Sequence, residues 1–429
     1  MHFSIPYGKS EARFSVDETA LLFDGRMEEI PQLADFEASL RESLARPIGC
    51  PPLAELARDK RNIVVLIEDN TRYTPLPLLL PILVNHLNES GVPDGAIRFL
   101  TAPGTHRVMT GDEIFEKVGG EIFRRFEILQ HDANDQGSLA DLGSVDVGGY
   151  DIPVHVNRIA LEADLLIGIG EIVPHSDAGY SGGAKIVQPG ICGFATTAAT
   201  HAAAGLLDEI PLGVMDNPCR LGMEVVGRQV GLDFIVNVVK NAAGQIAGVF
   251  SGDFVEAHRA GSKLAERSYR VEIPAPADIV VVSSSPCDLD YWQAEKGLVA
   301  AYFAVRPGGI IVFAAPCYEG MAHNHPRFLE WLAMPLHEIL TKMRVTSPDD
   351  LEADLVSADI AAGNARARER ASVFSVTEGL SGDDLEILQY TPYPSVQAAL
   401  DAALARMPKA RVGILPKGGT SLPVLLSRE

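Results

Sequence analysis

Four polar clusters in the sequence carry side chains suited to binding a small anion and moving protons on it. The first, EDNTRYTP, contains Asp69 and Arg72, and the second, APGTHR, contains His106. The third, GEIVPHSDAGYSGGAKIVQPG, contains His175 and Lys185. An imidazole exchanges protons near neutral pH because its unperturbed pKa is about 6.5. Arginine binds a carboxylate through paired N–H donors, so these residue types favour acid–base chemistry on a bound anion.

The fourth cluster, DLDYWQAEK, contains Gln293 and Lys296 and adds a second cation. The glycine-rich segment before Lys185 does not match the phosphate-binding loop, because Ala184 stands where that loop has glycine and Ile186 where it has serine or threonine. The segment also lacks the spaced GxGxxG turn of dinucleotide-binding folds. Neither of these nucleotide-binding motifs is therefore predicted here.

Each cluster alone has a simpler interpretation. A single histidine in a loop is usually solvated or hydrogen-bonded, because loops are polar in most proteins. Arg72 could form a local ion pair with Asp69 that contributes little to stability. The residue types and their order therefore predict an anion-binding cleft with two histidines, and they do not identify the reaction.

Strand-like runs rich in Val, Ile and Leu alternate with helical patterns along the chain. The six runs are NIVVLI (62–67), AIRFLT (96–101), ADLLIGI (163–169), FIVNVV (234–239), DIVVVSS (278–284) and GIIVFAA (309–315). This alternation is typical of an α/β fold with parallel or mixed sheets flanked by helices. Ligands bind such sheets beyond the carboxyl ends of the strands, and all four polar clusters fall there.

Two domains are expected, because 429 residues exceed the size at which a single core keeps growing. Two prolines in EIPAPAD precede a new strand, so we predict an N-terminal catalytic and cofactor-binding domain at 1–272 and a C-terminal α/β domain at 273–429. The active site would lie in the cleft between the two domains, with a hinge near residue 275 that closes over the substrate.

Three segments have recognisable helix signals. PLLLPILVNHLNESG has helical apolar spacing and ends at Gly91, a residue type that often terminates helices. Thr110 followed by Glu113 is the sequence pattern of a capping box. In the stretch 348–385, charges mixed with alanine predict a solvated helix surface.

The composition excludes several classes of partner. Acidic residues outnumber basic ones, 57 to 36, and the net charge of -21 repels nucleic-acid phosphates and anionic membrane surfaces. The N-terminal segment MHFSIPYGKSEARFSV has no signal-peptide pattern, and no stretch approaches the roughly 20 apolar residues of a spanning helix, so we expect a cytoplasmic protein. Five scattered cysteines without a CxxC pair predict neither disulfides nor a zinc site.

The central segment PHSDAGYSGGAK, followed by IVQPGICGF and His201, resembles the nickel-dependent lactate racemase family. Lys185 lies 10 residues and His201 lies 26 residues after His175, as in the family pattern. The motifs DNTRYTP, THR and QAEK, together with the opening IPYGKSEARFSV, extend the resemblance over most of the chain. The resemblance implies an isomerase, a racemase or epimerase, that inverts the C2 centre of a 2-hydroxy acid.

The resemblance also implies a cofactor and a role for each site residue. The cofactor would be a nickel-pincer nucleotide, nickel pyridinium-3,5-bisthiocarboxylic acid mononucleotide, which separate biosynthetic enzymes make and which a thioamide bond attaches to Lys185. The other implied residues are the catalytic pair His106 and His175, the nickel ligand His201, the cofactor-binding Asp69, Thr71 and Arg72, and the substrate-binding Arg72, Trp292, Gln293 and Lys296.

These residue types fit the chemistry of a 2-hydroxy acid. Its C2 hydrogen is very weakly acidic, because the carbanion would lie beside a carboxylate, whereas removal of a hydride gives a planar 2-keto acid. Hydride transfer is a task that side chains alone do not perform. Two histidines are needed because the hydroxyl group occupies a different position in each enantiomer. A soft sulfur–carbon–sulfur donor set completed by an imidazole suits nickel.

Several positions differ from the family pattern and predict a roomier, more polar pocket. Ser176 and Asp177 follow the catalytic histidine where aromatic residues are common, Ala184 precedes the cofactor lysine where a basic residue is common, and Trp292 replaces a common tyrosine. We therefore expect a larger or polyhydroxylated 2-hydroxy acid in preference to lactate, although Asp177 could equally be a surface residue.

Two alternative functions compete with the racemase. A nicotinamide-dependent 2-hydroxyacid dehydrogenase is disfavoured because no GxGxxG turn follows a predicted strand. A non-catalytic or cofactor-handling protein of the same fold is disfavoured because both histidines, Lys185 and His201 are all present. The sequence is compatible with a homo-oligomer but does not determine the number of subunits.

Overall fold

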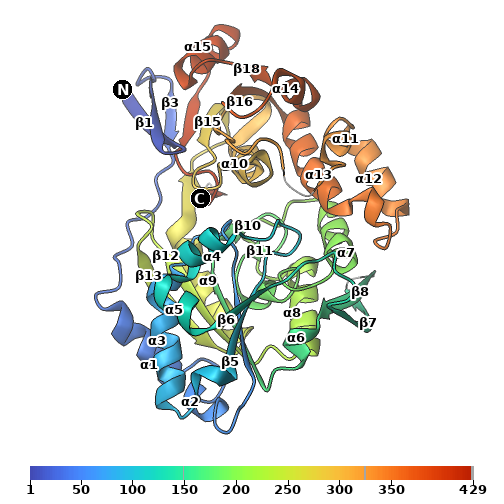
Figure 1. The fold of residues 1–429 in the computed structure, drawn as a ribbon. Helices are drawn as coiled ribbons and strands as arrows, with labels where there is room; N and C mark the ends of the chain where they lie inside the picture. Colours follow the sequence, from blue (N-terminus) through green and yellow to red (C-terminus); the bar gives the residue numbers. More distant parts are fainter. Residues whose placement is uncertain (148, 323–324, 427–429) are drawn as a thin grey trace.

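The computed structural model describes residues 1–147, 149–322 and 325–426, and these form two α/β domains (Figure 1). Each domain is built on a six-stranded sheet with helices on both faces. In Figure 1 the first domain occupies the lower part of the view, and the second domain, coloured yellow to red, occupies the upper part. The predicted α/β fold class is therefore confirmed.

The sheet of the first domain is parallel except at one edge. Its strands, in spatial order, are β13 (Ile246–Gly252), β12 (Phe234–Lys240), β9 (Leu165–Glu171), β4 (Ile63–Ile67), β5 (Ile97–Thr101) and β6 (Glu127–Gln130). Only β13 runs antiparallel to its neighbour. Four of these strands, β4, β5, β9 and β12, confirm the four runs predicted in this half of the chain.

Alternate residues of the central strand β4 face opposite layers of this domain. Ile63, Val65 and Ile67 pack with the helices of one layer, and Val64 and Leu66 pack with the other. The first layer contains α1 (Phe36–Ala45), α2 (Leu53–Leu56), α3 (Leu76–Glu89), α4 (Gly111–Val118) and α5 (Gly120–Arg125). The second contains α6 (Arg158–Leu161), α8 (Pro218–Val230) and parts of α7 (Phe194–Gly205) and α9 (Glu256–Tyr269). A strand covered on both faces needs a continuous apolar run, which is why these strands were recognisable.

The sheet of the second domain is entirely parallel. Its order is β18 (Thr391–Pro392), β17 (Ala371–Val376), β16 (Val305–Ala314), β15 (Ala277–Ser283), β19 (Val412–Leu415) and β3 (Leu21–Asp24). Strands β15 and β16 confirm the predicted runs 278–284 and 309–315. Its helices are α10 (Tyr291–Ala304), α11 (Phe328–Leu332), α12 (Leu336–Val345), α13 (Leu355–Arg370), α14 (Gly382–Leu388) and α15 (Val396–Arg406).

The first 24 residues lie with the second sheet. Strand β3 pairs with β19 at its edge, and the hairpin of β1 (His2–Tyr7) and β2 (Ser10–Ser15) packs Ile5 and Phe14 against Ile279 and Val281. The predicted division assigned these residues to the domain 1–272. No sequence pattern indicates this arrangement, because LLFD, at 21–24, is too short a run to identify its sheet.

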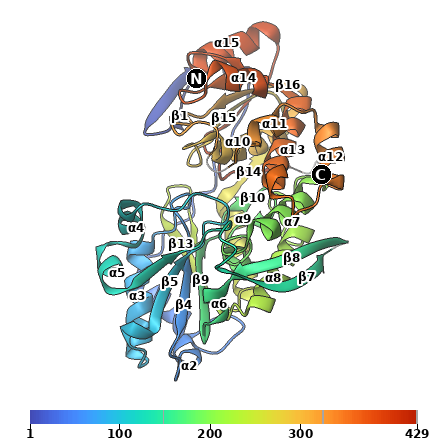
Figure 2. The same cartoon turned by 45° about the vertical axis from the view of Figure 1, so that its right-hand side comes forward.

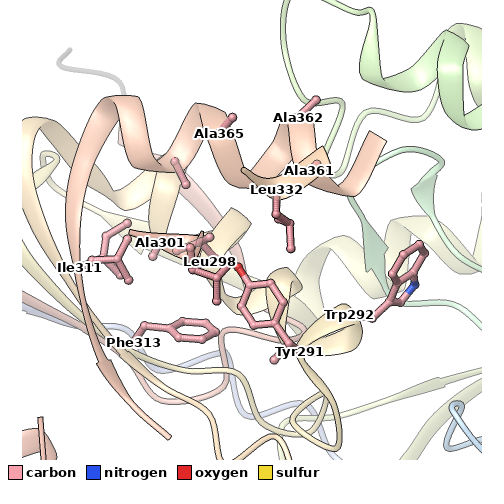
Figure 3. Packing of buried hydrophobic residues seen from close by; sticks show 14 of the residues in the cluster. Tyr291, Trp292, Leu298, Ala301, Ile311, Phe313, Leu332, Ala361, Ala362 and Ala365 are labelled. Carbon is pink, nitrogen blue, oxygen red and sulfur yellow. The ribbon is translucent and has the colours of Figure 1, made fainter. Parts of the chain in front are cut away.

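The stretch predicted to be solvated contains α13, and for this helix the prediction is wrong. Leu355, Val356, Ala358 and Ala361 are at most 1% exposed and pack in the core between α13, α10 and β16. Figure 3 shows this core, with Tyr291 and Leu298 of α10 beneath the helix that carries Ala361. Small residues allow α13 to be buried on more than one side despite the charges between them.

The other helix signals are confirmed. Helix α3 covers the predicted segment, with Gly91 at a φ of +92° just beyond its end, and α4 begins with the complete Thr110–Glu113 capping box. All five cysteines are free thiols. Within the described residues, none of the helices combines the length and hydrophobicity that a bilayer crossing requires.

Candidate active site

A cavity of about 90 Å³ lies between the carboxyl ends of the first sheet and the second domain. The loops after β4, β5 and β9 line it from the first domain, and α10 and α13 line it from the second. Nine of the ten predicted site residues line this cavity: Asp69, Arg72, His106, His175, Lys185, His201, Trp292, Gln293 and Lys296. The tenth, Thr71, lines a second cavity that adjoins the first.

His106, in the loop after β5, is held by Asp69, which follows β4. Nδ1 of His106 lies 2.8 Å from Oδ2 of Asp69, and the hydroxyl of Thr71 donates to the same carboxylate at 2.7 Å. Burial raises the pKa of Asp69, but the charge of His106 and the hydrogen bond with it lower that pKa far below its usual value. Burial lowers the pKa of His106. The carboxylate therefore accepts the Nδ1–H of a neutral imidazole, whose Nε2 can then accept a proton.

His175 lies in the short strand β10 (Pro174–His175) and is held in the opposite way. The backbone N–H of Asp177 donates to its Nδ1 at 3.2 Å, which leaves the imidazole proton on Nε2. Burial, together with the positive charges of Lys185 and Lys296, lowers the pKa of His175 well below its usual value. Oδ2 of Asp177 lies 3.6 Å from the same Nδ1, where it can stabilise the ring once it becomes charged.

Two cations from different domains border the cavity. Arg72 donates to the hydroxyl of Thr71 at 2.8 Å, and Lys296 of α10 donates to the side-chain oxygen of Gln293. The amide nitrogen of Gln293 lies 3.4 Å from Nε2 of His106. Among the described residues, no carboxylate forms an ion pair with Arg72 or Lys296, so both cations are available to an anionic ligand.

Lys185 lies in a short 3-10 helix (Gly183–Ile186) after β11 (Gly179–Tyr180). The side chain of Asn237 in β12 holds the start of this turn by accepting the backbone N–H of Gly183 at 2.8 Å. Within the described part of the chain, the Lys185 amine has no hydrogen-bond or ion-pair partner. Burial, with the charge of Arg72 adding to it, lowers the pKa of Lys185 to about 7. A large fraction of this amine is therefore unprotonated and nucleophilic near neutral pH.

His201 lies on α7 and contacts two carboxylates. Its Nδ1 is 2.7 Å from Oδ2 of Asp359 on α13 and 3.9 Å from Oδ2 of Asp177. Burial raises the pKa of Asp359 to about 7. Burial lowers the pKa of His201, but the hydrogen bond and charge of Asp359 raise it more, so the net change is an increase. The pair therefore holds a proton between Nδ1 and Oδ2. Ligand atoms of Asp177, His201 and Asp359 all lie within 4.8 Å of one another, a spacing that suits a metal ion.

Trp292 and Glu295 of α10 form one wall of the cavity. The Trp292 ring stacks on His325 with centroids 4.0 Å apart, and Figure 3 shows it at the side of the core cluster that faces the green ribbons of the first domain. Glu295 is 3% exposed and makes no hydrogen bond within the described residues. Burial raises its pKa to about 8, so this carboxyl group is mostly neutral and can donate or accept a hydrogen bond near pH 7.

The second cavity has a volume of about 260 Å³ and shares Arg72, His175 and Lys296 with the first. Its lining includes two further cations, Lys240 and Lys417. The combined space is larger than a three-carbon acid requires, and it can accept a second, larger group beside the substrate.

Sequence reasoning named most of the residues that line this cavity and missed two carboxyl groups, those of Glu295 and Asp359. The role of Asp69 as the hydrogen-bond partner of His106 was not predicted, since the expected partners were Arg72 or a cofactor. Asp177 is buried in the cavity wall and is not a surface residue. Glu295 stands within the QAEK motif and could have been noted, whereas nothing in the sequence relates Asp359 to His201, 158 residues away.

Comparisons with known proteins find similar sequences over most of this chain. The lactate racemase N-terminal domain matches residues 7–209, and the lactate racemase C-terminal domain matches residues 273–422. A curated lactate racemase from Lactiplantibacillus plantarum is 32% identical over 96% of this chain and 97% of its own length. Another, from Thermoanaerobacterium thermosaccharolyticum, is 28% identical over 97% of this chain and 98% of its own length.

Two solved structures are similar in fold. The lactate racemase apoprotein from Thermoanaerobacterium thermosaccharolyticum matches with a TM-score of 0.88 and 27% identity, covering 99% of this chain and 100% of that one. A protein from Thermotoga maritima matches with a TM-score of 0.72 and 22% identity, covering 93% of this chain and 100% of that one, which is a likeness of fold alone.

Proposed function

This chain belongs to the lactate racemase family and is an isomerase of the racemase type, and from this premise we propose that it inverts the C2 centre of a 2-hydroxy acid. The C2 hydrogen would leave as a hydride to an electrophilic centre that a bound cofactor would supply. A planar 2-keto acid would form, and the same hydride would return to its opposite face. The observation that carries the proposal is that two imidazoles with different hydrogen-bond partners border the same cavity as a nucleophilic lysine and His201.

The residues around Lys185 and His201 fit a tethered nickel-pincer nucleotide. An amine with a pKa of about 7 is reactive enough to form a thioamide bond, and the hydrogen bond from Nδ1 of His201 leaves its Nε2 as the nitrogen available to nickel. Such a cofactor supplies an electrophilic centre for the hydride, which no side chain can provide. The adjoining cavity of about 260 Å³ supports the presence of a group larger than the substrate.

His106 and His175 move the alcohol proton. Nε2 of His106 accepts the proton from one enantiomer while the N–H of His175 donates a hydrogen bond from the other side of the cavity. For the opposite enantiomer His175 is the base. Its Nε2 can accept the alcohol proton only when the neutral ring carries its own proton on Nδ1, beside Oδ2 of Asp177, and this carboxylate then stabilises the charge that His175 acquires. Asp69 holds His106 in the tautomer that can act as a base.

Arg72 and Lys296 hold the substrate carboxylate, so that C2 faces the cofactor and its hydroxyl group lies between the histidines. The side-chain amide of Gln293 contacts both Lys296 and His106, and it thereby fixes the position of the amine relative to the imidazole. Because Arg72 and Lys296 come from different domains, substrate binding should favour closure of the cleft and exclusion of water.

The proposed substrate is a 2-hydroxy acid larger than lactate. The curated relatives are named lactate racemases, which makes lactate the first compound to test. Asp177 and Glu295 add two hydrogen-bonding carboxyl groups to the cavity, which supports a substrate with further hydroxyl groups. Trp292 offers an apolar wall for the carbon chain of such a substrate.

The test uses protein co-expressed with the enzymes that make the cofactor. Intact-protein and peptide mass spectrometry should find a modification on Lys185, and metal analysis should find nickel in the same preparation. This protein should convert a single enantiomer of a 2-hydroxy acid into a mixture, and deuterium placed at C2 should stay in the product, because a returned hydride does not exchange with water. Protein from a host without those enzymes is the matched control.

Three outcomes would contradict the proposal. Modified protein that leaves lactate, dicarboxylic and aldonic 2-hydroxy acids unchanged would favour a non-catalytic role. Loss of the C2 deuterium to solvent would favour proton abstraction. Activity that requires added nicotinamide cofactor would favour the dehydrogenase.

A further inference from the structure

His201 and Asp359 form a buried contact between the two domains. His201 lies on α7 of the first domain and Asp359 on α13 of the second, and these helices lie side by side where the domains meet (Figures 1 and 2). The two side chains are 16% and 7% exposed. The residue expected to bind nickel therefore has its closest partner on the opposite domain.

The geometry of this contact determines the state of the imidazole. Oδ2 of Asp359 lies 2.7 Å from Nδ1 of His201, so it accepts the Nδ1–H and leaves the lone pair on Nε2. Oδ2 of Asp177, at 3.9 Å from the same nitrogen, is beyond hydrogen-bond distance. Among the described residues, Asp359 is thus the carboxylate that selects the tautomer of His201.

Close packing holds Asp359 in this position. Gly205, at the end of α7, lies so near that an added Cβ would be 2.9 Å from Oδ1 of Asp359 and 2.7 Å from the end of Met343. A glycine at this position therefore allows α13 to approach α7. The carboxylate of Asp359 is placed by the contact between two helices and not by a flexible loop.

We propose that Asp359 is a positioning residue for His201, and that this contact makes firm nickel binding depend on the two domains being together. Histidines that bind metals commonly donate their second ring N–H to a carboxylate, which sets the tautomer and the ring orientation, and loss of that partner weakens metal binding about 10- to 100-fold. The inference rests on the proposed function, because it concerns the nickel ligand of that site. It adds a residue from the second domain to a nickel site otherwise built from the first.

The test measures nickel retention separately from turnover. Wild-type protein and the variant Asp359→Ala, each co-expressed with the cofactor-making enzymes, are treated with a chelator, and retained nickel is followed with time. Asp359→Ala should lose nickel about 10- to 100-fold faster, with the mass of the Lys185 modification unchanged. Asp359→Asn should recover much of the retention, because the amide oxygen can still accept the Nδ1–H.

Two further variants separate positioning from a general loss of stability. Gly205→Ala keeps the carboxylate but pushes α13 from α7, so it should also accelerate nickel loss. Glu224→Gln removes a buried carboxylate that lies 2.7 Å from Arg259, away from both cavities, and should retain nickel as the wild type does. A change in the visible absorption of the nickel centre in the first variant, but not in the second, would support altered ligation.

Equal nickel retention by the wild type, Asp359→Ala and Gly205→Ala would overturn this inference while leaving the proposed function intact. Stoichiometric nickel binding by the unmodified chain, lost in both Asp177→Asn and Asp359→Asn, would also overturn it, because the carboxylates would then bind the metal directly. Wild-type protein that carries neither the Lys185 modification nor nickel would instead overturn the proposed function itself.

Discussion

His106 and His175 have the same side chain but opposite hydrogen-bond partners. Asp69 accepts the Nδ1–H of His106, whereas Nδ1 of His175 accepts the backbone N–H of Asp177. In this state the pair presents one unprotonated Nε2 and one Nε2–H to the cavity. An alcohol bound between them can lose its proton to His106 while its oxygen accepts a hydrogen bond from His175, which is the arrangement that the proposed reaction needs for one of the two enantiomers.

Replacing Asp69 with asparagine should disable His106 as a base. In Asp69→Asn the amide oxygen would keep the hydrogen bond from the Thr71 hydroxyl, so the amide N–H₂ would face Nδ1 of His106 and move the imidazole proton to Nε2. We expect kcat/KM for racemisation to fall about 100-fold or more, with the Lys185 modification retained, as measured by optical activity and mass spectrometry. Asp164→Asn, a carboxylate that accepts backbone N–H groups outside the cavity, is the control. A rate within a few-fold of wild type for Asp69→Asn would contradict the assignment.

At the scale of elements, the turn that carries Lys185 illustrates how tightly the fold constrains the site. Gly183 has a φ of +60°, and an added Cβ would lie 2.9 Å from Cγ of His258. The ring of His258 is fully buried and donates from Nε2 to the backbone oxygen of Ser181 at 2.8 Å, so it cannot move aside. The glycine is needed both for its backbone conformation and for the space it leaves.

Gly183→Ala should therefore destabilise the protein more than an ordinary glycine substitution in the left-handed region. We expect a loss of about 3 kcal/mol in the free energy of unfolding, from backbone strain of about 1–2 kcal/mol and overpacking of about 1–3 kcal/mol. Gly231→Ala is a matched control, because Gly231 has a φ of +86° but, among the residues that the structure describes, no atom lies within 4 Å of the added Cβ. Urea unfolding should show a larger loss in the free energy of unfolding for Gly183→Ala than for Gly231→Ala. Equal losses would mean that the His258 side chain moves to make room for the added Cβ.

The elements that could be predicted are those whose burial requires a recognisable order of residue types along the sequence. Buried parallel strands such as β4 need continuous apolar runs, and the polar residues after them share one edge of the sheet, so Arg72, His106 and His175 were expected to meet. Helix α13 was wrongly predicted to be solvated, because the charged residues in its sequence are interspersed with the small residues that are buried. The pairing of Asp359 with His201 depends on how two domains pack, and neither local spacing nor charge pattern contains that information.

At the scale of the whole molecule, the two domains divide the site between them. The first domain carries Lys185, His201, His106 and His175, and the second carries Lys296. The molecule has a net charge of -21, so an anionic substrate must be attracted by the cations that face the cleft. A cation on the second domain can therefore govern substrate binding without taking part in attachment of the cofactor.

The variant Lys296→Ala tests whether Lys296 binds the substrate without taking part in attachment of the cofactor. Loss of a charge-assisted hydrogen bond to the substrate carboxylate should raise KM about 10- to 100-fold. The Lys185 modification and nickel content should stay at wild-type levels, because in the described part of the chain Lys296 bonds to Gln293 and not to Lys185, His201 or Asp359. Steady-state kinetics and intact-protein mass spectrometry measure the two effects on one preparation. Lys409→Ala, at an exposed position of the second domain, controls for the loss of a single positive charge from the molecule. Loss of the Lys185 modification in Lys296→Ala would mean that Lys296 also holds the cofactor, and an unchanged KM would mean that Arg72 binds the carboxylate without it.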